Sequence, residues 1–167
     1  MTLPISLQDV EEAWDRIRPH IFYSPCAHSG LLSEQLGCQV YLKLDNMQST
    51  GSFKERGAAN KLALLTDEER ARGVIAASAG NHAQAVAMHG ARLGISTKIV
   101  MPEGTPLVKV QRTKSFGGEI VIHGANYDAA YAHAKERQEI DQRTFVHPFD
   151  DPAIMAGQGT VGLEILQ

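Results

Sequence analysis

Short apolar runs alternate with longer amphipathic segments over the second half of the chain. The runs that predict strands lie near 74–77, 97–101, 119–123 and 144–146. The segments between them carry apolar residues at helical spacing and predict helices near 81–93, 106–116 and 126–140. This alternation is typical of an α/β fold, in which helices cover both faces of a parallel sheet. Ligands bind such sheets at the carboxyl ends of the strands.

An amphipathic helix is predicted near the N-terminus. Ser6 and Asp9 have the spacing of a capping box, which pairs the free N–H groups at the start of a helix. Pro19 cannot continue a helix, so the helix is expected to end there or earlier. One helical face of this segment carries Val10, Ala13, Trp14 and Ile17.

Residues 29–62 predict a helix, a strand and a second helix, in that order. The first helix is expected over 29–35, because Gly37 suits the left-handed residue that ends many helices. Residues 40–45 alternate apolar and polar side chains, which predicts a strand with one buried face. The second helix carries residues 53–62, and a last helix is expected from about Met155 to Gln167.

The composition narrows the function classes. A net charge of −3 over 167 residues gives no sign of a nucleic-acid partner. No apolar run is long enough to span a membrane, and the N-terminus lacks the features of a signal peptide. Cys26 and Cys38 are too few for a disulfide framework, and no HExxH pattern predicts a zinc site. A protein of the reducing cytoplasm is expected, with His82 and His147 as packed or capping residues rather than metal ligands.

The segment from Ser49 to Gly57 reads Ser-Thr-Gly-Ser-Phe-Lys-Glu-Arg-Gly and places Lys54 on a glycine-rich turn that opens a helix. A free lysine amine has a pKa near ~10.4 and is protonated at neutral pH, so it is a poor nucleophile. Burial or the positive end of a helix lowers that pKa and allows Schiff-base chemistry with a carbonyl compound. A lysine here can also bind a phosphate or lie in solvent, and the segment alone leaves these interpretations open.

A second polar segment follows the strand near 74–77. Residues 78–82, Ser-Ala-Gly-Asn-His, form a turn of small residues that runs into an alanine-rich helix. This layout directs backbone N–H groups toward an anion such as a carboxylate or a phosphate, and Ser78 and Asn81 add side-chain donors. The alternative is an ordinary turn in which Ser78 or Asn81 only caps the helix.

Three sequence blocks occur in the order of a known family. The first is Ser49–Gly57, and the second continues Ser78–His82 with Ala83 and Gln84. The third is His-Pro-Phe-Asp-Asp-Pro at 147–152, continued by Ala-Gly-Gln-Gly-Thr at 156–160. Together they resemble the serine/threonine dehydratase family of fold-type II pyridoxal-phosphate enzymes, which have the tryptophan-synthase-β-like fold. The resemblance covers essentially the whole chain.

The resemblance implies a function and a cofactor. It implies a pyridoxal 5′-phosphate enzyme of amino-acid metabolism, such as isoleucine biosynthesis, that dehydrates and deaminates L-threonine, and L-serine, to 2-oxobutanoate or pyruvate and ammonia. Lys54 is then the Schiff-base lysine and the base that removes the Cα proton, a dual use that arginine does not support because it stays protonated.

The resemblance also assigns the remaining site residues. Phe53 packs against the cofactor ring and can at the same time be a core phenylalanine, and Asn81 hydrogen-bonds the 3′-oxygen of the cofactor. Arg56 is expected to be a structural or salt-bridging residue. The substrate carboxylate is then bound by Ser78, Ala79, Gly80 and His82, chiefly through backbone N–H groups, and Gln158 and Gly159 are expected to approach the active site.

Other functions remain open within and beyond this family. Serine racemases of the eukaryotic type tend to carry a serine at the position of Ala79, which delivers a proton to the opposite face of the cofactor; alanine favours elimination. Phe149 also resembles the dehydratases more than the racemases. The alternatives are serine racemase, hydroxyaspartate dehydratase, or a non-catalytic folded lobe. The motifs of the cysteine-synthase branch are spelled differently.

The resemblance also predicts the domain organisation. Residues 1–48 are expected to begin a large lobe, 49–152 to form a smaller cofactor-facing lobe, and 153–167 to return to the large lobe as a helix. Family members continue beyond this point, and their glycine-rich loop around the cofactor phosphate is expected to lie after Gln167. The 167-residue chain alone is therefore expected to bind pyridoxal phosphate weakly and to have little or no activity. A homo-oligomer is expected, and a nucleotide effector is known in some family members, although no residue here can be assigned to it.

Overall fold

The computed structural model describes residues 3–167 and contains a four-stranded parallel sheet in the order β5-β4-β3-β6. The strands span Val74–Ala77 (β3), Thr97–Met101 (β4), Glu119–Ile122 (β5) and Thr144–Phe145 (β6). In register, Val74 pairs with Thr97 on one side and with Thr144 on the other. The predicted α/β class and the predicted strand order along the chain are confirmed, and β5 and β6 are each one residue shorter than expected.

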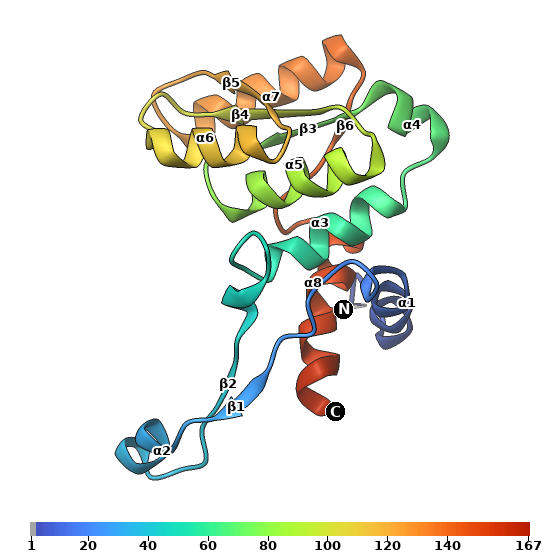
Figure 1. Ribbon diagram of the computed structural model, residues 1–167. Coiled ribbons are helices and arrows are strands. Elements are labelled where there is room, and N and C mark those ends of the chain that lie inside the picture. Colours follow the sequence, from blue (N-terminus) through green and yellow to red (C-terminus); the bar gives the residue numbers. More distant parts are fainter. Residues whose placement is uncertain (1–2) are drawn as a thin grey trace.

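Helices cover both faces of this sheet. Helices α5 (Asn81–Leu93) and α6 (Leu107–Ser115) lie on one face and α7 (Tyr127–Asp141) lies on the other (Figure 1). Alternate residues of β3 pack on opposite faces of the sheet, since side chains alternate along a strand. Val74 and Ala76 belong to the larger core cluster, which includes residues of α5, while Ile75 and Ala77 pack with residues of α7.

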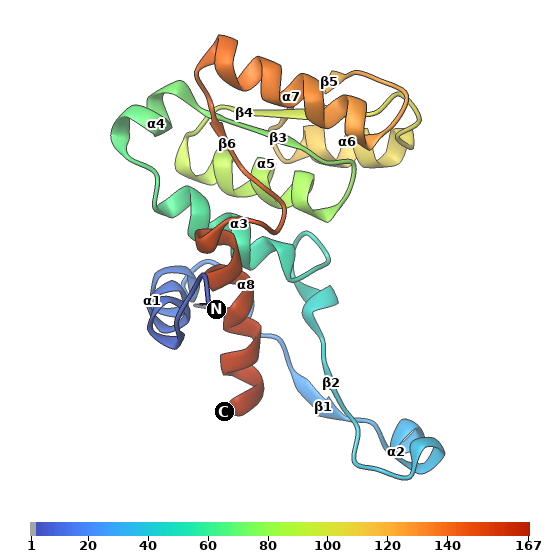
Figure 2. The ribbon, with the colours of Figure 1, turned by 180° about the vertical axis from the view of Figure 1, so that it is seen from behind.

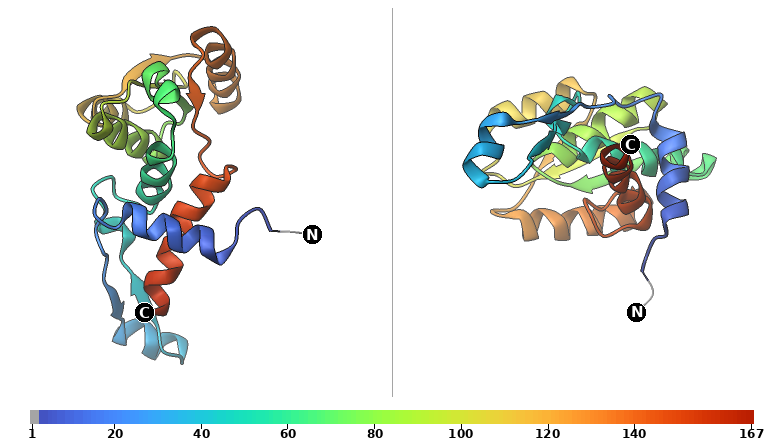
Figure 3. Two further views of the ribbon diagram at one scale, coloured as in Figure 1. Left: turned by 90° about the vertical axis from the view of Figure 1, so that its right-hand side faces the viewer. Right: turned by 90° about the horizontal axis from the view of Figure 1, so that it is seen from below.

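Helix α3 (Lys54–Ala63) joins the sheet to a second group of helices. It packs against α5 on one side and against α8 (Pro152–Leu166) on the other, and α1 (Leu7–Ile17) lies across α8 (Figure 2, Figure 3). The capping box predicted at Ser6 and Asp9 is present at the start of α1. The short helix α4 (Asp67–Arg72) connects α3 with β3.

Helix α8 begins earlier than predicted. It starts at Pro152, whereas the sequence predicted a start near Met155. Asp151 accepts hydrogen bonds from the N–H groups of Ala153 and Ile154, and proline is well tolerated at the first helical position because its missing N–H would be unpaired there anyway.

A two-stranded arm projects from the helical part of the molecule (Figure 1, Figure 3). It consists of β1 (Cys26–His28), α2 (Gly30–Leu36) and β2 (Tyr41–Lys43), with β1 and β2 antiparallel. The prediction of one buried face on the second strand is wrong: Tyr41 and Leu42 are 59% and 40% exposed. The alternation of residue types is there, but in the described residues no layer packs on either face of the arm. The 3₁₀ turn η1 (Asp45–Met47) follows the arm.

A buried charge network ties the base of the arm to α3 and α8. The Arg56 guanidinium, which is fully buried, donates to both oxygens of Asp45 at 2.8 and 2.9 Å and to both oxygens of Glu164 at 2.6 and 2.9 Å. Lys43 forms an ion pair with the same glutamate. Burial lowers the pKa of Arg56, but the hydrogen bonds that it donates to the two carboxylates, together with their charges, outweigh burial and raise the pKa. The predicted structural role of Arg56 is confirmed.

Residues 3–167 were also compared with the requirements of a membrane-spanning helix and of a metal site. None of their helices combines the length and the apolarity that crossing a membrane requires. Among residues 3–167, no three His, Cys, Asp or Glu side chains are grouped so as to hold a metal ion.

Candidate active site

Lys54 occupies the first residue of α3, and the turn before it is tightly held. Gly51 has a φ of +78°, which favours glycine. Thr50 donates to the buried carboxylate of Glu55 through its N–H and its hydroxyl, at 2.9 and 3.1 Å. The N–H of Lys54 donates to the Ser52 hydroxyl at 3.3 Å. These bonds fix the point at which the lysine side chain leaves the helix.

The Lys54 amine is half-buried and has one hydrogen-bond partner among the described residues. Nζ donates to the carbonyl oxygen of Pro148, which follows β6, at 2.7 Å. Burial lowers the pKa of Lys54, because it disfavours the charged ammonium. A larger fraction of the amine is therefore neutral, and nucleophilic, than for a solvated lysine.

The ring of Phe53 lies beside this amine. Its centroid is 5.2 Å from Lys54 Nζ, and 41% of the residue remains exposed. Phe53 is thus not part of the buried core, which was one of the two alternatives for it. An exposed aromatic face next to a reactive amine suits the binding of a planar ring compound.

The small-residue turn joins β3 to α5 at the carboxyl end of the strand. Ser78 continues the sheet ladder by donating its N–H to the Val100 carbonyl, and its hydroxyl accepts from the N–H of Gly80 at 3.2 Å. Gly80 is the N-cap of α5, and no side chain caps this helix. A Cβ on Gly80 would meet no atom within 4 Å, so the space before the helix is open. Free N–H groups at the start of a helix are a site for an anion.

His82 lies on the first turn of α5 and is buried. Its Nε2 lies 3.0 Å from the Val146 carbonyl, which can only accept, so Nε2 carries the proton. Burial, chiefly, and then the charges of Lys54 and His147 lower the pKa of His82 to about 4. The ring is neutral at physiological pH, which fits the predicted packed residue. His147 accepts from the N–H groups of Phe149 and Asp150, as predicted for a capping residue.

The segment after β6 brings the two predicted motifs together. Its carbonyls at Val146 and Pro148 accept from His82 on α5 and from Lys54 on α3. Asn81, the first residue of α5, is exposed, and no hydrogen bond of its side chain is present among the described residues. Ala79 is half-buried within the same turn.

The sequence analysis assigned no role to Pro148, and for Gln158 it predicted only an approach to the active site. Pro148 acts through its backbone carbonyl, which side-chain reasoning does not detect. Gln158 on α8 donates its amide to the same oxygen at 3.3 Å. The signal for both was present in the third sequence block, but nothing in that block shows where α8 crosses α3.

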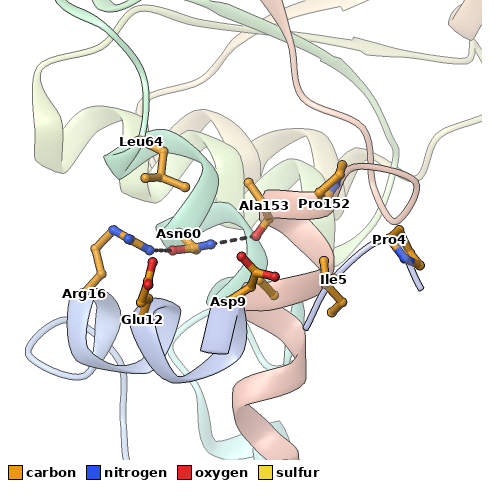
Figure 4. A pocket seen from close by; sticks show the side chains of 10 residues that line it. Pro4, Ile5, Asp9, Glu12, Arg16, Asn60, Leu64, Pro152 and Ala153 are labelled. Atoms are coloured by element: carbon orange, nitrogen blue, oxygen red, sulfur yellow. Dashed lines mark hydrogen bonds between the residues drawn. The ribbon is translucent and has the colours of Figure 1, made fainter. Parts of the chain in front are cut away.

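A separate hollow of about 220 Å³ lies between α1, α3 and α8 (Figure 4). Asn60 lies in its wall, where it accepts from Arg16 at 2.5 Å and donates to the Ala153 carbonyl at 2.8 Å. The amide is therefore fully occupied in joining the three helices. None of the predicted site residues lines this hollow, so we place the candidate site at Lys54 instead.

The geometry at Lys54 suits an aromatic aldehyde that carries anionic groups. The half-buried amine can attack a carbonyl carbon, and the Phe53 ring can lie against an aromatic ring. The uncapped start of α5 and the open space at Gly80 suit a carboxylate. Pyridoxal phosphate with an amino-acid substrate has these groups, so the residues present fit it.

Comparisons with known proteins give consistent results. The family described as "Pyridoxal-phosphate dependent enzyme" matches residues 17–167. An L-threonine ammonia-lyase of Thermotoga maritima is 48% identical over 98% of this chain and 41% of its own length. The catabolic L-threonine dehydratase TdcB of Escherichia coli K12 is 47% identical over 99% of this chain and 50% of its own length. The chain thus spans about half the length of the curated relatives it matches.

Solved structures share the fold. Threonine deaminase isoform 2 of Solanum lycopersicum matches 96% of this chain and 48% of its own, with a TM-score of 0.87 and 40% identity. A maize serine racemase matches 98% of this chain and 50% of its own, with a TM-score of 0.94 and 34% identity.

Proposed function

The chain belongs to the family of pyridoxal-phosphate dependent enzymes, and from this premise we propose that its site serves the dehydration and deamination of L-threonine. L-serine is a second substrate in this proposal, and the products are 2-oxobutanoate or pyruvate with ammonia. The observation that carries the proposal is the half-buried Lys54 amine, held 2.7 Å from the Pro148 carbonyl beside the uncapped start of α5. The names of the relatives as threonine ammonia-lyases and dehydratases support the substrate.

Lys54 has two tasks in this proposal. When bound, pyridoxal phosphate supplies a carbonyl carbon for attachment and an electron sink for the carbanion. Lys54 Nζ holds the cofactor and then takes the proton from the substrate Cα. The lowered pKa of Lys54 supports this role, since a base must be neutral before it can accept a proton.

In this proposal the remaining site residues bind and orient the substrate and the cofactor. The N–H groups of the Ser78–His82 turn bind the substrate carboxylate, and Ala79 and Gly80 leave room for it. Phe53 packs against the cofactor ring and Asn81 hydrogen-bonds the 3′-oxygen that the ring carries. The buried His82 keeps the turn in place through its bond to Val146.

Replacement of the lysine tests the proposal. In a chain extended to the length of its relatives, the Lys54→Ala variant should lose the absorbance of bound cofactor and all threonine turnover, while its far-ultraviolet circular dichroism stays unchanged. Lys54→Arg is the matched control, because it keeps the positive charge but stays protonated and cannot act as the base. Threonine turnover by Lys54→Ala would overturn the proposal.

Serine racemase is the second candidate, and the fold match to the maize enzyme favours it. Ala79 is evidence against racemase activity, because a methyl group cannot deliver a proton to the second face of the substrate. Hydroxyaspartate dehydratase and a non-catalytic lobe stay alternatives without an observation that favours them.

The setting of the enzyme is part of the proposal. We place it in the cytoplasm, supported by the free, exposed Cys26 and Cys38. Self-association is supported by exposed apolar residues of the arm, such as Leu31 and Tyr41. The division at 48/49 and 152/153 and the nucleotide effector stay predictions.

A further inference from the structure

Two side chains from different helices donate to one carbonyl oxygen in the candidate site. Lys54 on α3 reaches the Pro148 oxygen at 2.7 Å, and Gln158 on α8 reaches it at 3.3 Å. Pro148 itself is buried. A carbonyl oxygen has two lone pairs, so both bonds can exist together.

The position of Gln158 depends on a glycine in α3. A Cβ on Gly57 would lie 3.0 Å from both Cγ and Nε2 of Gln158. Gly57 follows Lys54 by three residues and therefore lies on the same side of α3, almost one turn further along. The absent side chain at Gly57 leaves the space through which the Gln158 amide reaches the oxygen beside the lysine.

The proposed function requires the Lys54 amine to leave this oxygen. The amine cannot attack a carbonyl carbon or accept a Cα proton while its lone pair is taken up by a proton and the ammonium is held on Pro148. If Lys54 were the sole donor, its departure would leave the carbonyl of a buried residue without a protein partner, and an unpaired carbonyl shielded from water carries a free-energy penalty. A second donor removes that penalty.

We propose that Gln158 is a positioning residue: it keeps the Pro148 carbonyl paired whenever the Lys54 amine leaves it, and so frees the amine to react. The inference rests on the proposed function of Lys54 as the reactive amine. Gln158 touches neither substrate nor cofactor in this proposal and acts only through Pro148. The titratable groups of this region include His82 on α5 and His147 after β6, which interact electrostatically with each other, and Asp150 and Asp151, which follow Pro148 in the chain.

The reactivity of Lys54 without cofactor tests this inference. We would acetylate the purified protein with a limiting reagent across a pH series and follow the Lys54 peptide by mass spectrometry. In Gln158→Leu the Pro148 oxygen keeps only the lysine, so the ammonium should be held more firmly. The expected result is a higher pKa of Lys54 and a rate of acetylation at pH 8 that is lower by about 3- to 10-fold.

A second variant and a control separate this effect from packing. Gln158→Glu cannot donate and adds a negative charge within about 6 Å of the Lys54 ammonium, because both groups reach the same oxygen. It should raise the pKa of Lys54 further and slow the acetylation at pH 8 more than Gln158→Leu does. Gln142→Glu adds the same charge at the exposed end of α7, before β6, and should leave the acetylation of Lys54 unchanged.

The outcomes are distinct from those of the turnover test. Unchanged acetylation of Lys54 in both Gln158 variants, with circular dichroism like that of the wild type, would refute the role of Gln158 and leave the proposed function standing. If Gln158→Leu does not fold, the acetylation of Lys54 in Gln158→Glu and in the nearly isosteric Gln158→Met tests the role of Gln158 instead. Turnover by Lys54→Ala would instead refute the proposed function, whatever Gln158 does.

Discussion

Two buried histidines on α5 bear directly on the stability of the protein. His89 is fully buried, and neither of its ring nitrogens has a hydrogen-bond partner among the described residues. Burial, followed by the charges of Arg92 and His20, lowers the pKa of His89 to about 3, while that of His82 is lowered to about 4. Both rings are therefore neutral in the folded protein well below their usual pKa.

These two values predict a loss of stability in acid. In the unfolded chain a histidine binds a proton below pH ~6.5, whereas the buried rings stay neutral until about pH 4 and 3. The unfolded state therefore binds more protons, and the free energy of unfolding falls as pH drops from about 6.5 toward 4, by on the order of 2 kcal/mol for each histidine. Urea unfolding at pH 7, 6, 5 and 4 measures how the free energy of unfolding changes with pH.

The His89→Leu variant isolates one of these contributions. Leucine removes two unpaired nitrogens from the core, so the variant should be as stable as the wild type at pH 7 or more stable, by up to about 2 kcal/mol. It should also lose less stability between pH 6.5 and 4. His28→Leu on the exposed arm is the control and should leave the pH dependence unchanged. A strongly destabilised His89→Leu would show that the ring has a partner.

Ala79 predicts how the reaction can be redirected. Ala79→Ser places a hydroxyl in the turn where a second proton donor would be needed for racemisation. In a chain extended to the length of its relatives, detectable D-serine from L-serine is expected in the variant and not in the wild type, with 2-oxo acid still formed. Chiral chromatography measures the first product and a coupled dehydrogenase assay the second. D-serine formation by the wild type would favour the racemase alternative.

At the scale of elements, two glycines set how closely α3 and α8 cross. A Cβ on Gly157 would lie 2.6 Å from the Arg56 carbonyl and 2.9 Å from Gly57 Cα. Gly157→Ala must therefore push the helices apart, and it should destabilise the protein by about 1–3 kcal/mol. Gly162→Ala on the same helix meets no atom within 4 Å and should stabilise the protein by up to about 1 kcal/mol. Chemical unfolding of both variants measures the difference; equal stabilities would contradict the close crossing.

At the scale of the whole molecule, the Arg56 network joins the arm, α3 and α8. Arg56→Met leaves Asp45 and the fully buried Glu164 side chain without their main cation, and we expect a loss of about 3–5 kcal/mol in the free energy of unfolding. Arg18→Met breaks the exposed pair with Asp15 and should cost under about 1 kcal/mol. Thermal unfolding of the two variants and the wild type compares their stabilities. A small effect of Arg56→Met would mean that Lys43 alone neutralises the carboxylates.

The sequence predicted the sheet well because its periodicity is local. Strands β3 and β4 and helix α5 begin and end at the predicted residues, since each is bounded by a glycine or a polar turn. The buried face predicted for residues 40–45 failed for the opposite reason. Alternation shows only that a face can be buried, and the described arm has no layer packed on Tyr41 or Leu42.

By itself, the sequence determined the α/β class, the order of the elements and the lysine and turn motifs, because these depend on residues close together in the chain. Only the tertiary structure decided that Lys54, His82 and Gln158 meet on the segment after β6. Their partners are backbone carbonyls 64, 94 and 10 residues away in sequence, for His82, Lys54 and Gln158 respectively. Every residue carries the same backbone carbonyl, so no pattern of side chains shows which carbonyl accepts a given hydrogen bond. For Lys54 and Gln158, the close crossing of α3 and α8 at Gly57 brings both side chains to the Pro148 carbonyl.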